Sequence, residues 1–158
     1  MIQINNLIKS FEETQVLKGI STIFEKGKTN LIIGQSGSGK TVFLKCVLGL
    51  FEATDGDIVF DNTSLKSMDL KTRALLRQDI GMVFQGSALF DSMTVEENIM
   101  FPMKMFTDAD EDEIRDRANT AINRVNLIDA NHKMPSEISG GMKKRVAIAR
   151  AIIMNPKY

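Results

Sequence analysis

An eight-residue string, Gly34-Gln35-Ser36-Gly37-Ser38-Gly39-Lys40-Thr41, constrains this chain more than any other feature. It fits the pattern G-x-x-x-x-G-K-[ST], and it lies between a strand-like and a helix-like apolar run. Glycines let the backbone take positive φ and approach a phosphate closely, so that successive N–H groups converge on its oxygens. Lys40 can then neutralise the terminal phosphates, and the Thr41 hydroxyl is placed to ligate Mg²⁺. The string therefore predicts a phosphate-binding P-loop rather than an ordinary Gly/Ser connection.

Strand-like and helix-like segments follow one another along the chain, which predicts an α/β fold. Residues 2–4 and 16–24 favour paired strands with Lys18-Gly19 between them. Further strands are expected at residues 29–33 (buried), 56–60 and 80–84, and helices at 41–50, 69–78, 111–127 and 141–154. The character of the sequence changes near residue 86. We therefore predict a β-subdomain with the P-loop core at residues 1–86 and a helical subdomain at residues 87–158.

Two further stretches could belong to a nucleotide site. Gln85 ends a strand-like run, where its side-chain amide could ligate the metal or the attacking water, although a glutamine there is usually a solvated surface residue. Ser139-Gly140-Gly141 precedes a helix-like segment; the serine is a natural N-cap, and the two glycines expose bare N–H groups. In isolation this is a flexible cap, but downstream of a P-loop it indicates a second anion site.

Composition restricts the partners. Lysine plus arginine and aspartate plus glutamate each number 20, so the near-zero net charge gives no broad field that would attract nucleic acid. Cys46 is the single cysteine, and the first residues lack the apolar core of a secretion signal, which favours a reducing, cytoplasmic location. Charged residues interrupt each apolar run before the roughly 20 residues that a membrane helix needs. We expect no nucleic-acid partner, and membrane contact only through another subunit.

Three stretches together resemble the motifs of the ATP-binding subunits of ABC transporters. The string GQSGSGKT resembles their Walker A motif. The string VFQ, which ends at Gln85, resembles their Q-loop, and ISGGMKKRVAIARA resembles their signature motif. Phe11 lies where the family usually has the aromatic residue that stacks on adenine, although a core position would suit it equally. Residues 93–99 are similar to the stretch that opens the family's helical subdomain. The resemblance implies the P-loop NTPase fold of ABC ATPases, with ATP and Mg²⁺ as cofactors.

The resemblance also implies a role for each site residue. Lys40 and Gln85 would take part in catalysis, and Thr41 and Gln85 would bind the metal. The Walker A residues would bind ATP in cis. In the family two ATPase subunits face head to tail, so that Ser139, Gly140 and Gly141 would act in trans on the γ-phosphate held by the other subunit. The implied partners are a second ATPase subunit and a transmembrane permease, with the chain held at the inner face of the cell membrane.

The signature departs from the family's usual L-S-G-G-Q and later Gln-Arg at Ile138, Met142 and Lys144. Residues 142–145, MKKR, resemble those of the ATPases of Mla-type, MCE-associated lipid-transport systems, which implies a lipid cargo.

The family's Walker B aspartate and catalytic glutamate follow a stretch that corresponds to Lys157-Tyr158. We therefore expect an incomplete sheet, exposed strand edges, and nucleotide binding without turnover by residues 1–158 alone, the full-length protein being the ATPase. The alternative is a non-transport ABC protein or a nucleotide-binding fragment without catalysis.

Overall fold

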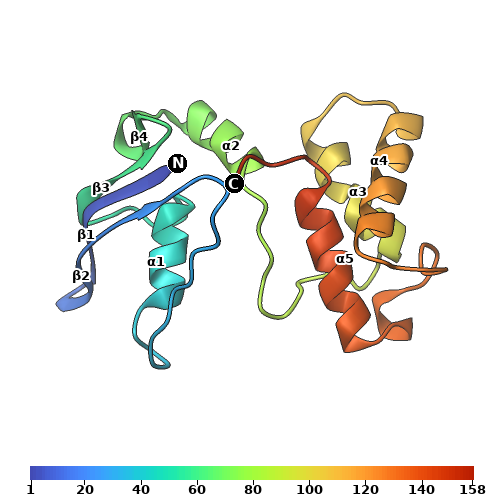
Figure 1. Cartoon of the computed structure of the whole chain (residues 1–158), viewed down its shortest axis with the longest axis horizontal. Coiled ribbons are helices and arrows are strands. Elements are labelled where there is room, and N and C mark those ends of the chain that lie inside the picture. Colours follow the sequence, from blue (N-terminus) through green and yellow to red (C-terminus); the bar gives the residue numbers. More distant parts are fainter. The chain divides into compact units, whose positions relative to one another are not determined.

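The computed structural model describes residues 1–158, whose contacts form two compact units, Met1–Arg77 and Gln78–Tyr158. Figure 1 labels the elements of each unit along the chain. The boundary between the units comes before the division at residue 86 that the sequence suggests for the subdomains; that division stays a prediction.

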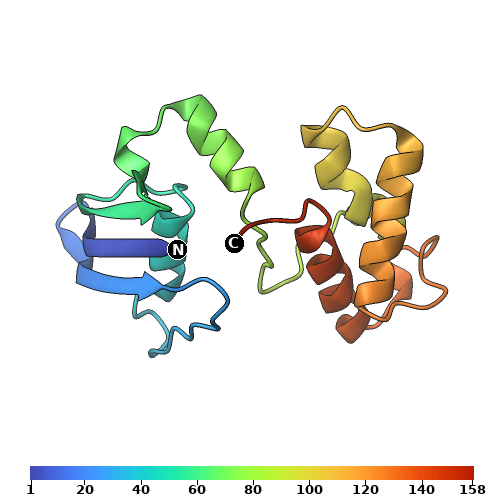
Figure 2. The same ribbon diagram turned by 45° about the horizontal axis from the view of Figure 1, so that its top comes forward.

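The first unit is built on an antiparallel sheet with the strand order β2-β1-β3-β4. Figure 2 shows β1, β2 and β3 side by side, with α1 behind them. The buried side chains of Ile4 and Leu17 belong to the two longest strands, and Ile4 lies opposite Ile58 of β3. The strands are β1 (Ile2–Phe11), β2 (Thr14–Phe24), β3 (Asp55–Phe60) and β4 (Thr63–Ser64).

The paired strands predicted from residues 2–4 and 16–24 are confirmed as β1 and β2, but their hairpin turns at Glu12 and Glu13, and Lys18-Gly19 lies inside β2. Gly19 lies inside β2 with φ 85°, where the register shifts against β1. A Cβ at Gly19 would come within 2.7 Å of Asn6 Oδ1. Gly19 therefore marks a β-bulge. Such a bulge needs a residue with positive φ, as many turns do, so composition alone does not distinguish the two.

Helices complete the first unit. Helix α1 (Lys40–Val47) buries Phe43, Cys46 and Val47, and the Phe43 ring meets Phe24 of β2 edge to face at 6.1 Å between centroids. A short 3-10 helix, η1 (Leu65–Ser67), and α2 (Leu70–Gln78) follow β4. The helices expected at 41–50 and 69–78 are thus present, within a few residues.

Residues 29–33 and 80–84 are not strands in this structure, contrary to the expectation from their apolar, β-branched sequences. Leu31 and Ile33 are 85% and 80% exposed. A strand exists only through hydrogen bonds to a neighbour, and residues 29–33 have no neighbouring strand. At the start of the other segment, Gly81 N donates to Tyr158 O at 2.8 Å and Tyr158 N donates to Asp79 O at 3.0 Å, which is the bonding pattern of a parallel pair.

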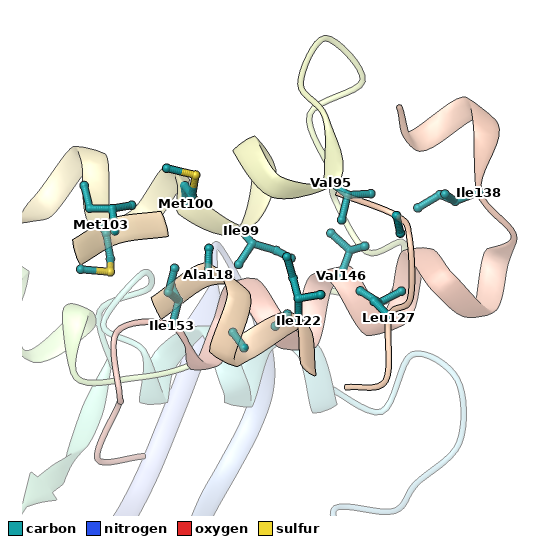
Figure 3. Packing of buried hydrophobic residues seen from close by; sticks show 14 residues of the cluster. Val95, Ile99, Met100, Met103, Ala118, Ile122, Leu127, Ile138, Val146 and Ile153 are labelled. Carbon is teal, nitrogen blue, oxygen red and sulfur yellow. The ribbon is translucent and has the colours of Figure 1, made fainter. Parts of the chain in front are cut away.

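The second unit is helical and has a core of its own. Figure 3 shows side chains of its three long helices directed toward one another. The stripe predicted from the sequence at Ile114, Ala118, Ala121 and Ile122 is buried, while Val125 is only partly buried. The elements are α3 (Val95–Phe106), α4 (Glu111–Arg124), η2 (Pro135–Glu137) and α5 (Gly140–Ile152).

A buried asparagine fixes the loop that leads into α3. Asn98 is fully buried, and its Nδ2 donates to the carbonyl oxygens of Phe90, Met93 and Thr94, each at 3.0 Å. Its Oδ1 accepts from Phe90 N at 2.8 Å. Thr94 and Glu97 add a capping box at the helix start. Because all these groups are satisfied, residues 90–94 are held firmly against α3.

None of the helices combines the length and the apolar character that crossing a bilayer requires.

Candidate functional site: a nucleotide-binding loop and a signature helix

The loop at residues 34–41 connects the extended segment 29–33 to α1 and has two glycines in left-handed conformations. Gly37 and Gly39 have φ of 80° and 92°. A Cβ at Gly37 would touch nothing, so its φ and not crowding requires glycine, whereas a Cβ at Gly34 would lie 2.6 Å from Ser38 Oγ. Ser38 N donates to Gln35 O at 3.2 Å and closes a turn within the loop. The local sequence therefore dictates a curled, exposed backbone ahead of the helix.

Lys40 places its charge over this loop. Its Nζ donates to Gly34 O and to Gln35 O, both at 2.8 Å. Gly39 gives the helix no side-chain cap, and the amides of Gly39, Lys40 and Thr41 donate to no other group of the chain. Free amides, the positive end of a helix and an ammonium group are the donor set that phosphate oxygens require. The residues present therefore fit the terminal phosphates of a nucleotide.

Thr41 occupies the second position of α1, and its side chain is exposed beside the loop. Its hydroxyl offers one oxygen ligand, which suits a magnesium ion that keeps several waters and also binds phosphate oxygens. The structure contains no group of three or more His, Cys, Asp or Glu side chains that could hold a metal elsewhere. Gln85 is exposed just after residues 80–84, in the second unit, with its amide free to face solvent.

Phe11 ends β1 and is not a core residue, because 39% of it is exposed. Its ring meets Phe51 edge to face at 5.4 Å between centroids, and Lys9 Nζ lies 4.8 Å from its centroid. The core alternative is therefore wrong. Stacking on adenine stays a prediction.

The second anion site predicted from sequence lies at the start of α5. Ser139 is the N-cap, and its Oγ accepts from Met142 N at 3.2 Å. Gly140 and Gly141 are exposed and lack positive φ; an added Cβ at Gly140 would meet nothing within 4 Å, and one at Gly141 only Ser139 Oγ at 3.9 Å. Packing within the chain does not explain why these two positions are glycine.

The structure thus brings together residues 34–41 and places Phe11 in the same unit, while Gln85 and residues 139–141 belong to the other. Sequence reasoning missed Asn98, which holds the loop before α3, and the contacts of Arg150, whose guanidinium donates to Ser87 O and Ala88 O at 2.8 Å. A single asparagine among the apolar residues of α3 was the only available signal for the first. For Arg150 there was none beyond its place in the signature-like stretch ISGGMKKRVAIARA.

A sequence model of the ABC transporter family matches residues 17–158. The chain belongs to the ABC transporter family. This ABC chain is 41% identical over 157 residues to the glutamine transport ATP-binding protein GlnQ of Escherichia coli (strain K12), an alignment that covers 99% of the chain and 65% of GlnQ. It is 36% identical over 156 residues to the probable ribonucleotide transport ATP-binding protein mkl of Mycobacterium tuberculosis (strain ATCC 25618 / H37Rv), covering 99% of the chain and 44% of mkl. The chain therefore spans two thirds or less of the length of these relatives.

A solved structure supports the fold. The ABC chain superposes with a TM-score of 0.86 and 32% identity on the dimeric, post-hydrolysis ATP-binding cassette MJ0796 bound to ADP and Pi, covering 99% of this chain and 71% of that one. The predicted α/β fold of an ABC ATPase is thus confirmed.

Proposed function

We propose that this chain is the nucleotide-binding portion of an ABC transporter ATPase, in which the loop at residues 34–41 holds the phosphates of ATP together with Mg²⁺. The observation that carries this proposal is the Lys40 ammonium lying over a loop whose following amides donate to nothing else in the chain. Lys40 neutralises the β- and γ-phosphates, Thr41 supplies a metal ligand, and Gln85 orients the metal or the attacking water. Phe11 receives the adenine ring.

We also propose that the chain acts as a head-to-tail dimer. The N-cap Ser139 and the bare backbone of Gly140 and Gly141 then face the γ-phosphate held by the second subunit. Two observations support this: the absence of any contact in the chain that would require those glycines, and the dimeric state and bound ADP and Pi named for MJ0796.

The proposed second partner is a transmembrane permease, which would hold the chain at the cytoplasmic face of the membrane. Two exposed apolar side chains at the end of α3, Met105 and Phe106, support such a contact, because adjacent exposed apolar groups commonly mark a surface that another protein covers. GlnQ and mkl are both described as transport proteins.

Lipid is the narrower cargo proposal, and its support is residues 142–145 alone. The names of GlnQ and mkl point to glutamine and ribonucleotides instead. Stimulation of the full-length protein with its permease by lipid vesicles, and not by amino acids or nucleotides, tests the cargo directly.

The test of the nucleotide site is a titration of residues 1–158 with a fluorescent ATP analogue and Mg²⁺. We expect Lys40→Ala to weaken binding about ten-fold or more, since charge-assisted contacts to phosphate are lost. Lys45→Ala is the matched control, because Lys45 lies on the same helix with its Nζ 5.0 Å from the Phe51 ring centroid. Equal binding by the wild type and Lys40→Ala would overturn the proposal.

Hydrolysis is tested separately. We propose, as the family resemblance implies, that residues 1–158 as a purified polypeptide bind ATP without steady phosphate release. The full-length protein should release phosphate, and Lys40→Ala should abolish that release. Steady, Lys40-dependent release from residues 1–158 alone would show that the catalytic carboxylate lies elsewhere in the chain.

A further inference from the structure

The side chain of Arg150 on α5 holds two consecutive carbonyl groups just after Gln85. Its Nη2 donates to Ser87 O and its Nη1 to Ala88 O, both at 2.8 Å. Ser87 and Ala88 have φ of 63° and 47°, so both lie in the left-handed region that non-glycine residues rarely adopt. A strained pair persists only where the surroundings fix it; here the guanidinium fork binds both carbonyls, and Ser87 N also donates to Phe84 O at 3.0 Å.

The surroundings of Arg150 direct its charge at these carbonyls. It takes part in none of the chain's ion pairs, and its guanidinium carbon lies 5.9 Å from the Phe90 ring centroid. Burial lowers the pKa of Arg150, but a guanidinium stays charged at any physiological pH. A partly buried cation with no carboxylate partner stabilises the structure through the groups it does contact, which here are the two carbonyls and the face of the Phe90 ring.

The two hydrogen bonds from Arg150 to Ser87 O and Ala88 O form a clamp that lies between two parts of the proposed site. Gly86 alone separates Gln85 from the clamped pair, and an added Cβ at Gly86 would meet nothing within 4 Å. Asn98 holds the far end of the same loop at Phe90. Ser139 caps the other end of the helix that carries Arg150. Residues 87–90 are therefore fastened to α3 and α5, whereas Gln85 itself is exposed and is held only through its chain neighbours.

We propose that Arg150 is a positioning residue that acts through Ser87 and Ala88 to fix Gln85 relative to α5, so that the signature end of the helix and Gln85 move as one body. This inference rests on the proposed ATPase function. An α-helix transmits displacement along its axis with little deformation, over about 16 Å from Ser139 to Arg150 at 1.5 Å per residue. Engagement of Ser139 by the second subunit's nucleotide then sets where Gln85 stands.

Local proteolysis tests the clamp without reference to ATP. Chymotrypsin cuts after Phe84, Leu89 and Phe90, and cleavage at these residues follows local opening of the loop. Replacing Arg150 by glutamine should raise the cleavage rate of this segment about ten-fold or more, while the rest of the second unit stays protected. Arg145→Gln is the matched control, because Arg145 on the same helix donates to Asn126 O at 3.1 Å and not to this loop. Unchanged cleavage in Arg150→Gln, or equal loss of protection throughout α3 to α5, would overturn the proposal.

A double-mutant cycle in the full-length protein tests the action on Gln85. We expect Arg150→Gln and Gln85→Ala each to lower kcat about ten-fold or more, since small displacements of a positioned group cost rate, while the affinity for the ATP analogue is unchanged. The double variant should lose no more than either single variant, and Arg150→Lys, which keeps the charge but not the fork, should recover only part. Additive losses, or full recovery by lysine, would sink the proposal. If the proposed function itself fails, the wild type shows no Lys40-dependent turnover at all, whereas the proteolysis result stands.

Discussion

Individual glycines of this chain are retained for two different physical reasons. Gly56 has φ 82°, and a Cβ there would lie 2.2 Å from Asn6 O, so β1 and β3 could not pair around any other residue. Gly140 does not have a positive φ, and a Cβ added there would meet no atom within 4 Å. The first kind serves the fold, and the second is free to serve a contact outside the chain.

For the first kind, replacing Gly56 by alanine should cost roughly 2–4 kcal/mol, from the left-handed conformation and from the clash with backbone that cannot move aside. Gly27→Ala is the control: its φ is 75° but its surroundings are open, so only the conformational cost of about 1 kcal/mol remains. Urea unfolding of both variants measures the difference. Equal destabilisation would mean that the β1–β3 contact adapts.

For the second kind, Gly140→Ala should leave the stability unchanged or raise it by up to about 1 kcal/mol, because alanine favours helix over glycine. The same change should lower ATP turnover of the full-length protein, since the methyl group enters the space proposed for the second subunit's phosphate. Thermal unfolding and a phosphate-release assay on one preparation check both halves. Full turnover at raised stability would place the phosphate elsewhere.

The residues of the nucleotide loop could be named from the sequence because their spacing is local: glycine, lysine and threonine occur within eight positions. The partner of Arg150 could not. It lies more than 60 positions away, on carbonyl groups that any residue type offers, and only the left-handed turn at Ser87 and Ala88 brings them within reach.

At the scale of elements, helices are easier to predict than strands because a helix satisfies its own hydrogen bonds. The apolar stripe of α4 locates that helix, and the left-handed Asn126 ends it earlier than the stripe suggests. Residues 29–33 have strand composition but no neighbouring strand, so their sequence alone could not make them one. At Gly19 the sequence does not distinguish a β-bulge from a turn, because both can require a residue with positive φ.

The capping box of α3 gives a prediction for stability and its pH dependence. Thr94→Ala should destabilise the second unit by about 1 kcal/mol, because Glu97 N loses its acceptor. The Thr94 backbone N–H lowers the pKa of Glu97, so this carboxylate stabilises the folded state above its unfolded pKa. That contribution is lost as the pH falls through the lower, folded pKa.

Glu97→Gln should therefore flatten the acid limb of the stability curve while leaving the neutral plateau slightly lower. Urea midpoints at a series of pH values check this, with Glu96→Gln as the neighbouring control. An unchanged acid limb would show that other carboxylates govern acid unfolding.

At the scale of the whole molecule, both units leave some large apolar side chains exposed. The second has a continuous core over α3, α4 and α5, whereas the first leaves Leu31 and Ile33 largely exposed on an unpaired segment. An extended apolar segment with open hydrogen-bonding groups is a template for pairing with another chain.

Residues 1–158 as an isolated polypeptide should therefore self-associate through this segment. Leu31→Thr with Ile33→Thr should reduce association in light scattering and size-exclusion chromatography, because threonine removes apolar surface but keeps strand propensity. Leu70→Thr is the control, since Leu70 is 83% exposed but at the start of a helix. Equal association of all variants would locate the contact elsewhere.

Asn98 has a consequence for the chain's slowest motions. The Phe90 amide lies outside every helix and strand, yet it donates to an oxygen of a side chain that solvent does not reach. Its hydrogen can be replaced by deuterium only when Asn98 Oδ1 releases the amide, which requires this loop to open away from α3. In a residue-by-residue exchange profile, this loop position should stand beside the most protected amides of α3 and α5, an island of protection in a stretch without regular structure.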